Sequence, residues 1–253
     1  ILDRWQHGLD DEWWTTLFFE NHDQPRSVSR FGDDKRYRYE SATALATVLL
    51  TLRGTPFVYQ GQELGMTNTT FESLDDVADV DTVRNVRELM ADGVYGEYGE
   101  VRGVVEARSR DNARTPIQWT DGRHAGFPDG DPWLPVNDDY EAVNAARERD
   151  RTPSVLSYYR TLIDVRKGSE PLRYGSYELH YPDDEQLYVY ERSLDGERVV
   201  VVLNLSGESR SADVDPVGAS AALLLGNYES VPEAVGEPFD LRPYEARLYA
   251  ESR

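Results

Sequence analysis

The chain has 253 residues, and its 47 acidic and 27 basic residues give a formal charge of -20. This charge disfavours nucleic acids and anionic membranes as partners, because both carry the same sign. The sequence contains no cysteine, which excludes disulfides, thiolate metal sites and cysteine nucleophiles. We expect a folded, acidic, cytoplasmic protein, because no secretory leader pattern follows Ile1.

The basic residues are almost all arginine, with two lysines, Lys35 and Lys167. Dense surface carboxylates with scarce lysine predict a halophilic protein, whose acidic surface keeps it hydrated at molar salt. The alternative is an ordinary acidic protein from a genome whose codons favour arginine. The first residues, Ile1 to Trp5, read like the middle of a domain, so we expect a longer protein to continue upstream.

A strand, a helix and a strand are predicted near the start of the chain. Residues 16–20 form a short apolar run that ends in polar residues 21–25, which is typical of a buried parallel strand. Residues 39–53 show helical apolar spacing, with Gly54 placed as a C-cap. Residues 55–59 are a second buried run. This order predicts a βαβ unit of a parallel α/β fold.

The rest of the chain changes character twice. Residues 64–152 are predicted to be long and irregular, with one helix near 82–90, and residues 155–167 form another helix. Short strands follow, and they predict an antiparallel all-β module. The predicted strands are 174–181, 187–192, 199–205, 221–225 and 246–250.

The cluster Asn21-His22-Asp23 follows the first predicted strand, at the end where catalytic loops gather in α/β folds. It is a candidate general base pair, metal-ligand pair or clamp on a polar substrate, and equally a helix-capping turn. We expect no metal site, because the other three histidines show no ligand spacing with His22.

Three further segments carry candidate residues. Gln62 and Glu63 end the second predicted strand. They are either site residues or the start of a polar loop. Arg114 is flanked by turn formers and favours a structural ion pair. The aromatic-rich loop 119–133 suits stacking on sugar rings or packing on itself.

Several motifs make the sequence similar to a known family. They are NHDQPR (21–26), RFG (30–32), GTP to YQG (54–61), LGMTN (64–68), DNARTP (111–116), QW (118–119), HAGF (124–127) and LRPYEA (241–246). In these motifs the chain resembles the α-amylase family of glycoside hydrolases (family 13), within it the oligo-1,6-glucosidase and α-glucosidase branch. The resemblance covers essentially the whole chain.

The resemblance implies the C-terminal part of a (β/α)8 TIM barrel, about strands seven and eight, in residues 1–170. An antiparallel β-sandwich domain would follow in residues 171–253. Asp23 matches the third catalytic carboxylate of the family, which stabilises the transition state. His22 matches a residue that binds the same sugar. Arg114 matches an arginine that closes the pocket, paired with an aspartate from early in the barrel.

The implied activity is that of a retaining exo-α-glucosidase acting on terminal α-1,4 or α-1,6 bonds, without a cofactor. No segment matches the family's nucleophilic aspartate or acid glutamate, which belong to barrel strands four and five. We therefore expect this chain alone to be inactive and to require the N-terminal remainder of the barrel. The alternatives are a sucrose- or trehalose-forming isomerase or transglucosidase, and a non-catalytic transporter subunit or glycan-binding relative.

Overall fold

The computed structural model describes residues 2–7, 13–212, 221–231 and 239–252. The chain divides into two compact units. The strand unit comprises residues 1–18, 32–57 and 157–253, and the loop unit comprises residues 19–31 and 58–156. In the described part of the chain, no helix combines the length and the apolar character needed to cross a membrane.

The strand unit contains the predicted strand, helix and strand. The strands β1 (Thr16–Leu17) and β2 (Thr55–Pro56) pair in parallel, and the helix α3 (Arg38–Thr51) lies between them in the chain. This arrangement confirms the predicted βαβ order. Both strands are shorter than predicted. Their ladder ends with the bond from Phe57 N to Leu17 O.

Gly54 does not have its predicted role as a helix cap. The C-cap of α3 is Leu52, in extended conformation. Gly54 instead has a φ of +141°, and a Cβ there would lie 2.8 Å from the carbonyl oxygen of Thr15. The glycine is needed because the chain passes so close to β1.

The helix α3 is buried all round over residues 41–51. Its threonines do not leave unpaired hydroxyls in this core. Thr47 and Thr51 donate to the carbonyl oxygens four residues earlier, and their hydroxyls also bond the hydroxyls of Tyr158 and Tyr190. Because these hydroxyl groups have hydrogen-bond partners, the threonines can be buried in the core.

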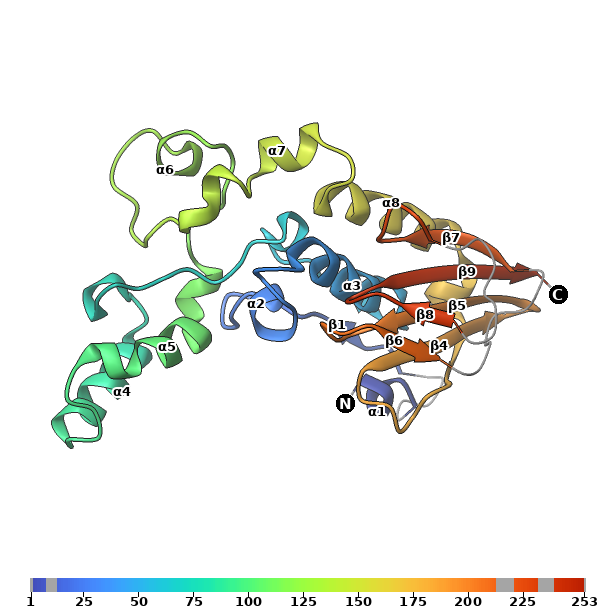
Figure 1. Ribbon diagram of the computed structural model, residues 1–253, viewed down its shortest axis with the longest axis horizontal. Helices are drawn as coiled ribbons and strands as arrows, with labels where there is room; N and C mark the ends of the chain where they lie inside the picture. The colour runs from blue at the N-terminus through green and yellow to red at the C-terminus, as the bar shows by residue number, and fades with distance from the viewer. Residues whose placement is uncertain (1, 8–12, 213–220, 232–238, 253) are drawn as a thin grey trace. The chain divides into compact units, whose positions relative to one another are not determined.

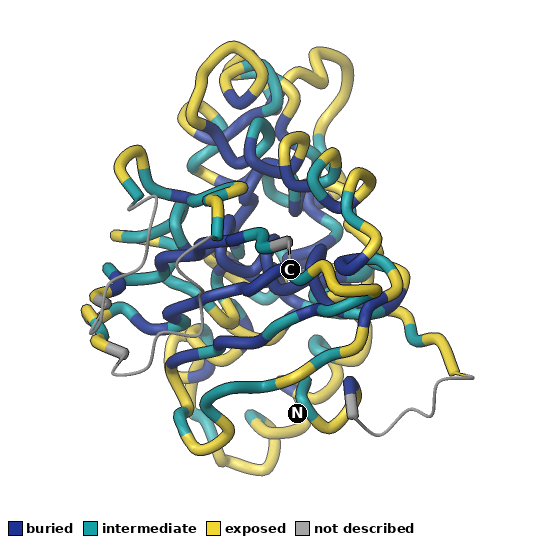
Figure 2. The backbone as a smooth tube through the Cα atoms, turned by 90° about the vertical axis from the view of Figure 1, so that its right-hand side faces the viewer, coloured by how far each residue is buried: buried dark blue, intermediate teal, exposed yellow. Residues whose placement is uncertain are grey.

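The five predicted C-terminal strands are present as an antiparallel sheet in the order β3-β4-β5-β9-β7. Figure 1 labels four of them, β4, β5, β9 and β7. Its centre is buried (dark blue in Figure 2) around Val189, Val200, Val202 and Tyr249. Two strands were not predicted, β6 (Arg210–Ala212) and β8 (Phe239–Leu241), which pair with each other. The sheet strands are β3 (Ser176–Leu179), β4 (Leu187–Leu194), β5 (Glu197–Asn204), β7 (Ala222–Gly226) and β9 (Ala246–Ser252).

Among the described residues of the strand unit, three helices are present besides α3. The helix α8 (Val155–Gly168), which begins at the end of the loop unit, confirms the prediction for 155–167. The others are α1 (Leu2–His7) and α9 (Glu170–Tyr174). The predicted domain boundary at residue 170 stays a prediction.

The loop unit is richer in helix than predicted. The helix α4 (Val80–Ala91) confirms the prediction near 82–90, but α5 (Tyr98–Arg108) lies in the stretch predicted to be irregular. The two helices share a small core around Phe71, Val86 and Val101, and they lie side by side in Figure 1. The shorter helices of this unit are α2 (Ser27–Phe31), α6 (Arg123–Gly126) and α7 (Ala145–Asp150), with 3-10 turns η1 (Gln62–Leu64), η2 (Leu74–Asp76), η3 (Arg110–Ala113) and η4 (Asp138–Glu141).

Candidate active site

The cluster Asn21-His22-Asp23 forms a tight turn. The side-chain oxygen of Asn21 accepts a hydrogen bond from the amide of Asp23 (2.8 Å), and its carbonyl oxygen accepts one from Gln24 N (3.2 Å). Asn21 thus satisfies the backbone of the turn, in the way that Asn commonly does. The carboxylate of Asp23 remains available for partners outside the turn.

The structure brings the three predicted site residues together. Arg114 Nη2 donates to Asp23 Oδ1 (2.8 Å), and Arg114 Nε donates to the carbonyl oxygen of His22 (2.8 Å), across more than 90 residues of sequence. His22 Nε2 lies 3.2 Å from Asp23 Oδ2. The Asp23 side chain is 45 % exposed and that of Arg114 is 24 % exposed. A partly exposed carboxylate is therefore held by a cation and keeps room to accept further hydrogen bonds.

Arg114 points at Asp23 because the residues before it are fixed. Asp111 is fully buried, and its Oδ2 accepts from the amides of Ala78 and Asp79, both at 2.7 Å. Asn112, also buried, accepts from Thr69 N (3.0 Å). These bonds anchor η3. Asp111 and Asn112 therefore have a structural role in this motif. Arg114 itself makes an ion pair, as favoured from sequence, with Asp23 and at 3.5 Å with Asp111.

Arg110 is a second cation at Asp23 that sequence reasoning did not single out. Its Nη1 lies 3.6 Å from Asp23 Oδ1, while its Nη2 bonds Asp79 and lies 2.9 Å from Asp81. Burial alone would raise the pKa of Asp79, but hydrogen bonds from Arg110 and Thr82 hold this pKa below its ordinary value. The available signal was proximity in sequence, because Arg110 opens the 3-10 turn η3 and Arg114 is its C-cap.

Gln62 and Glu63 bond within their own turn. Gln62 Oε1 accepts from Tyr59 N (3.3 Å) and Glu63 Oε2 accepts from Gly61 N (2.9 Å). Burial raises the pKa of Glu63 above its ordinary value. These contacts support the polar-loop reading of this pair over the reading as site residues.

A buried ion pair holds together the segments that carry the candidate site. Arg26 Nη1 lies 3.0 Å from Glu20 Oε2 and also donates to Gln60 O (2.8 Å), while Arg26 Nη2 donates to Ala113 O (3.5 Å). Glu20 Oε1 accepts from the amide and the hydroxyl of Ser27, at 2.7 and 2.6 Å. Arg26 therefore ties the turn of Asp23 to the residue directly before Arg114.

This arrangement is suited to binding a polar, neutral molecule. A carboxylate flanked by two guanidinium groups accepts hydrogen bonds from hydroxyl groups and stabilises positive charge placed above it. Among the described residues, no group of three or more His, Cys, Asp or Glu side chains is placed to hold a metal ion.

Known families match the chain along nearly its full length. The model of the α-amylase catalytic domain matches residues 1–175, and that of the maltogenic amylase C-terminal domain matches residues 177–248. The chain therefore belongs to the α-amylase family of glycoside hydrolases, and it contains the C-terminal part of that family's barrel followed by a β domain.

Two individual relatives within this family are similar to the chain. The chain is 44 % identical over 250 residues to an oligo-1,6-glucosidase of Halalkalibacterium halodurans, covering 98 % of this chain and 44 % of that protein. It is 39 % identical over 248 residues to a trehalose-6-phosphate hydrolase of Escherichia coli K12, covering 97 % and 44 %. The chain thus spans less than half the length of these relatives.

Solved structures agree with this assignment. Trehalose-6-phosphate hydrolase of Bacillus licheniformis superposes with a TM-score of 0.92 at 38 % identity, covering 100 % of this chain and 46 % of that one. Trehalulose synthase MutB of Pseudomonas mesoacidophila MX-45 gives 0.90 at 40 % identity, covering 98 % and 45 %.

Proposed function

We propose that the protein containing this chain is a retaining exo-α-glucosidase that hydrolyses terminal α-1,4 or α-1,6 bonds of malto- or isomalto-oligosaccharides. The observation that carries the proposal is the 2.8 Å pair of Asp23 and Arg114, with His22 beside it. These three residues match the family's third carboxylate and two of its sugar-binding positions. The similarity to oligo-1,6-glucosidases supports the choice of substrate.

Asp23 acts in this proposal on the transition state. Glycosidic cleavage passes through an oxocarbenium-like ring, which is positively charged, so a fixed carboxylate beside it lowers the barrier. Hydrogen bonds from Asp23 to ring hydroxyls strengthen as the ring distorts. Arg114 holds the carboxylate in place and closes the wall of the sugar pocket, and His22 binds the same sugar.

The nucleophile and the general acid are supplied by the remainder of the barrel. Retention needs two carboxyl groups about 5–5.5 Å apart, and the family places them on barrel strands four and five. This chain alone is accordingly inactive, and the complete protein needs no cofactor. A cytoplasmic location remains part of the proposal.

Transglucosylation to an isomer is the second candidate, favoured by the similarity to trehalulose synthase. The experiment is product analysis by NMR on the complete protein with maltotriose, isomaltose, sucrose and trehalose 6-phosphate. Release of α-glucose from maltotriose or isomaltose supports the proposal. Release of β-glucose, conversion of sucrose to an isomer, or cleavage of trehalose 6-phosphate alone would each reject it.

A further inference from the structure

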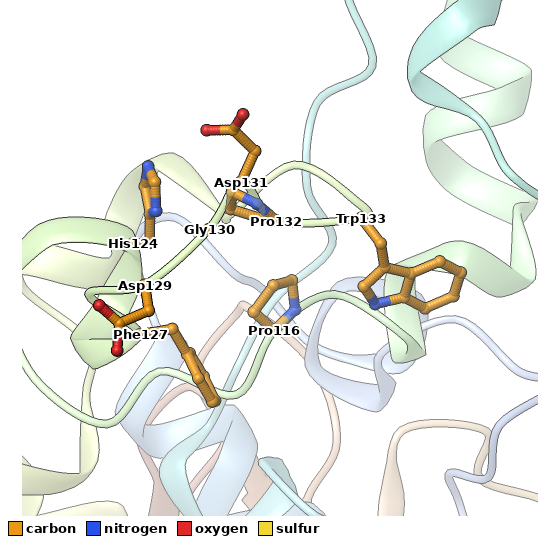
Figure 3. Close-up of a pocket in the computed structure, with 8 residues that line it drawn as sticks. All are labelled: Pro116, His124, Phe127, Asp129, Gly130, Asp131, Pro132 and Trp133. Carbon is orange, nitrogen blue, oxygen red and sulfur yellow. The ribbon is translucent and has the colours of Figure 1, made fainter.

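The aromatic-rich loop after Arg114 encloses a hollow that the proposed mechanism does not use. The hollow has a volume of about 340 Å³ and lies entirely in the loop unit (Figure 3). Small-molecule sites typically have volumes of about 300–1,000 Å³, so the hollow has room for one sugar ring. Its lining includes Pro116, His124, Phe127, Asp129, Pro132 and Trp133.

The hollow presents aromatic surface to solvent. Trp133 is 66 % exposed and Phe127 is 43 % exposed. Figure 3 shows Pro116 between these two side chains, beneath the loop that carries Pro132. Exposed apolar surface rimmed by polar groups is typical of a binding site. The flat apolar C–H face of a pyranose ring complements such a strip of rings.

The backbone of this loop is held in a defined shape. His124 and Ala125 have φ values of +51° and +57°, in the left-handed region that non-glycine residues rarely adopt. Ala125 is fully buried, and its carbonyl oxygen accepts from Trp119 N (2.9 Å) and Thr120 N (3.2 Å). Such strained residues persist where the surroundings fix them, and they cluster at ligand-holding segments.

The charge of the lining selects the class of ligand. Asp129 and Asp131 line the hollow, and in Figure 3 both carboxylates point away from Pro116. No lysine or arginine lines the hollow among the described residues. An anionic ligand would therefore be repelled by the two carboxylates, which favours a neutral ligand.

We infer that this hollow binds one glucose unit of a neutral glucan, in addition to the site at Asp23 and Arg114. The choice of a glucan rests on the proposed function. Aromatic stacking supplies the affinity, through Trp133 and Phe127, and the charge of Asp129 and Asp131 disfavours anionic ligands.

Calorimetric titration of the complete protein with maltotriose tests the inference, in an Asp23→Asn background that suppresses turnover. We expect two binding sites in this background. Adding Trp133→Ala or Phe127→Ala should weaken one site about tenfold or more, which corresponds to about 1.4 kcal/mol. The matched control is Trp119→Ala, because Trp119 is exposed in the same loop and does not line the hollow.

Three results would overturn the inference. They are a single maltotriose site in the Asp23→Asn background, unchanged binding after Trp133→Ala, and binding of choline, an organic cation, in place of maltotriose. Circular dichroism confirms that each variant folds. Hydrolysis of p-nitrophenyl α-glucoside by the wild-type protein tests the proposed function separately, so the two failures are distinguishable.

Discussion

Glu20 and Arg26 form an ion pair of 3.0 Å in which neither side chain is more than 1 % exposed. The turn between them carries His22 and Asp23. Arg26 also bonds the carbonyl oxygen of Ala113, the residue before Arg114. The geometry of the candidate site therefore depends on a buried charge pair that does not itself reach the surface.

Breaking this pair should destabilise the protein strongly. Arg26→Met leaves the carboxylate of Glu20 buried without its cation, which costs about 3–5 kcal/mol. The free energy of unfolding, measured by urea titration of the complete protein, checks this. The matched control is Arg84→Met, which removes an exposed pair with Asp81 at 3.0 Å and should cost no more than about 1 kcal/mol. Equal losses in the two variants would contradict the role given to Arg26.

Arg114→Ala should weaken short substrates more than long ones. Arg114 pairs with Asp23, and in the proposed function it forms the wall against the terminal sugar, where a disaccharide has few other contacts to compensate. The ratio of kcat/KM for maltose to that for a longer malto-oligosaccharide should therefore fall. Arg114→Lys keeps the charge but not the paired bonds to Asp23 and to the His22 carbonyl, and it should restore only part of the loss. A uniform loss across chain lengths would count against the pocket-wall role.

The stability of the complete protein should rise with salt. The charge of -20 makes exposed carboxylates repel one another, over about 30 Å at 0.01 M salt but only about 3 Å at 1 M. Thermal melts of the complete protein between about 0.05 and 3 M KCl should show a rising midpoint as this repulsion is screened. A midpoint that stays level or falls would reject the halophilic reading and leave codon bias to explain the arginines.

Local patterns predicted most of the elements but not their exact ends. The βαβ order, the helix α8 and the five sheet strands follow from apolar runs bounded by turn residues. The helix α5 was missed because Gly99 and Gly103 lower its intrinsic helix propensity, and packing of Val101 against α4 compensates for them. The strands β6 and β8 have three residues each, too few for an alternating pattern to stand out.

The candidate residues were predictable, but several of their contacts were not. The resemblance identified Asp23, His22 and Arg114, whereas the contact of Arg110 with Asp23 depends on how η3 is anchored by Asp111. Such contacts join residues about 90 positions apart, and no local signal encodes them. The pairing of Arg114 with an aspartate from early in the barrel stays a prediction.

The most direct measurement of the central claim is kcat for Asp23→Asn in the complete protein. If Asp23 stabilises the transition state, kcat should fall by about 10²–10³-fold or more, while the melting temperature changes little, because Asp23 is 45 % exposed. Asp121→Asn is the matched control, since Asp121 is an exposed carboxylate of the same unit, and it should keep wild-type kcat. An Asp23→Asn enzyme that retains more than about a tenth of wild-type kcat would contradict the account. Such a result would mean that the substitution removes less than about 1.4 kcal/mol of transition-state stabilisation.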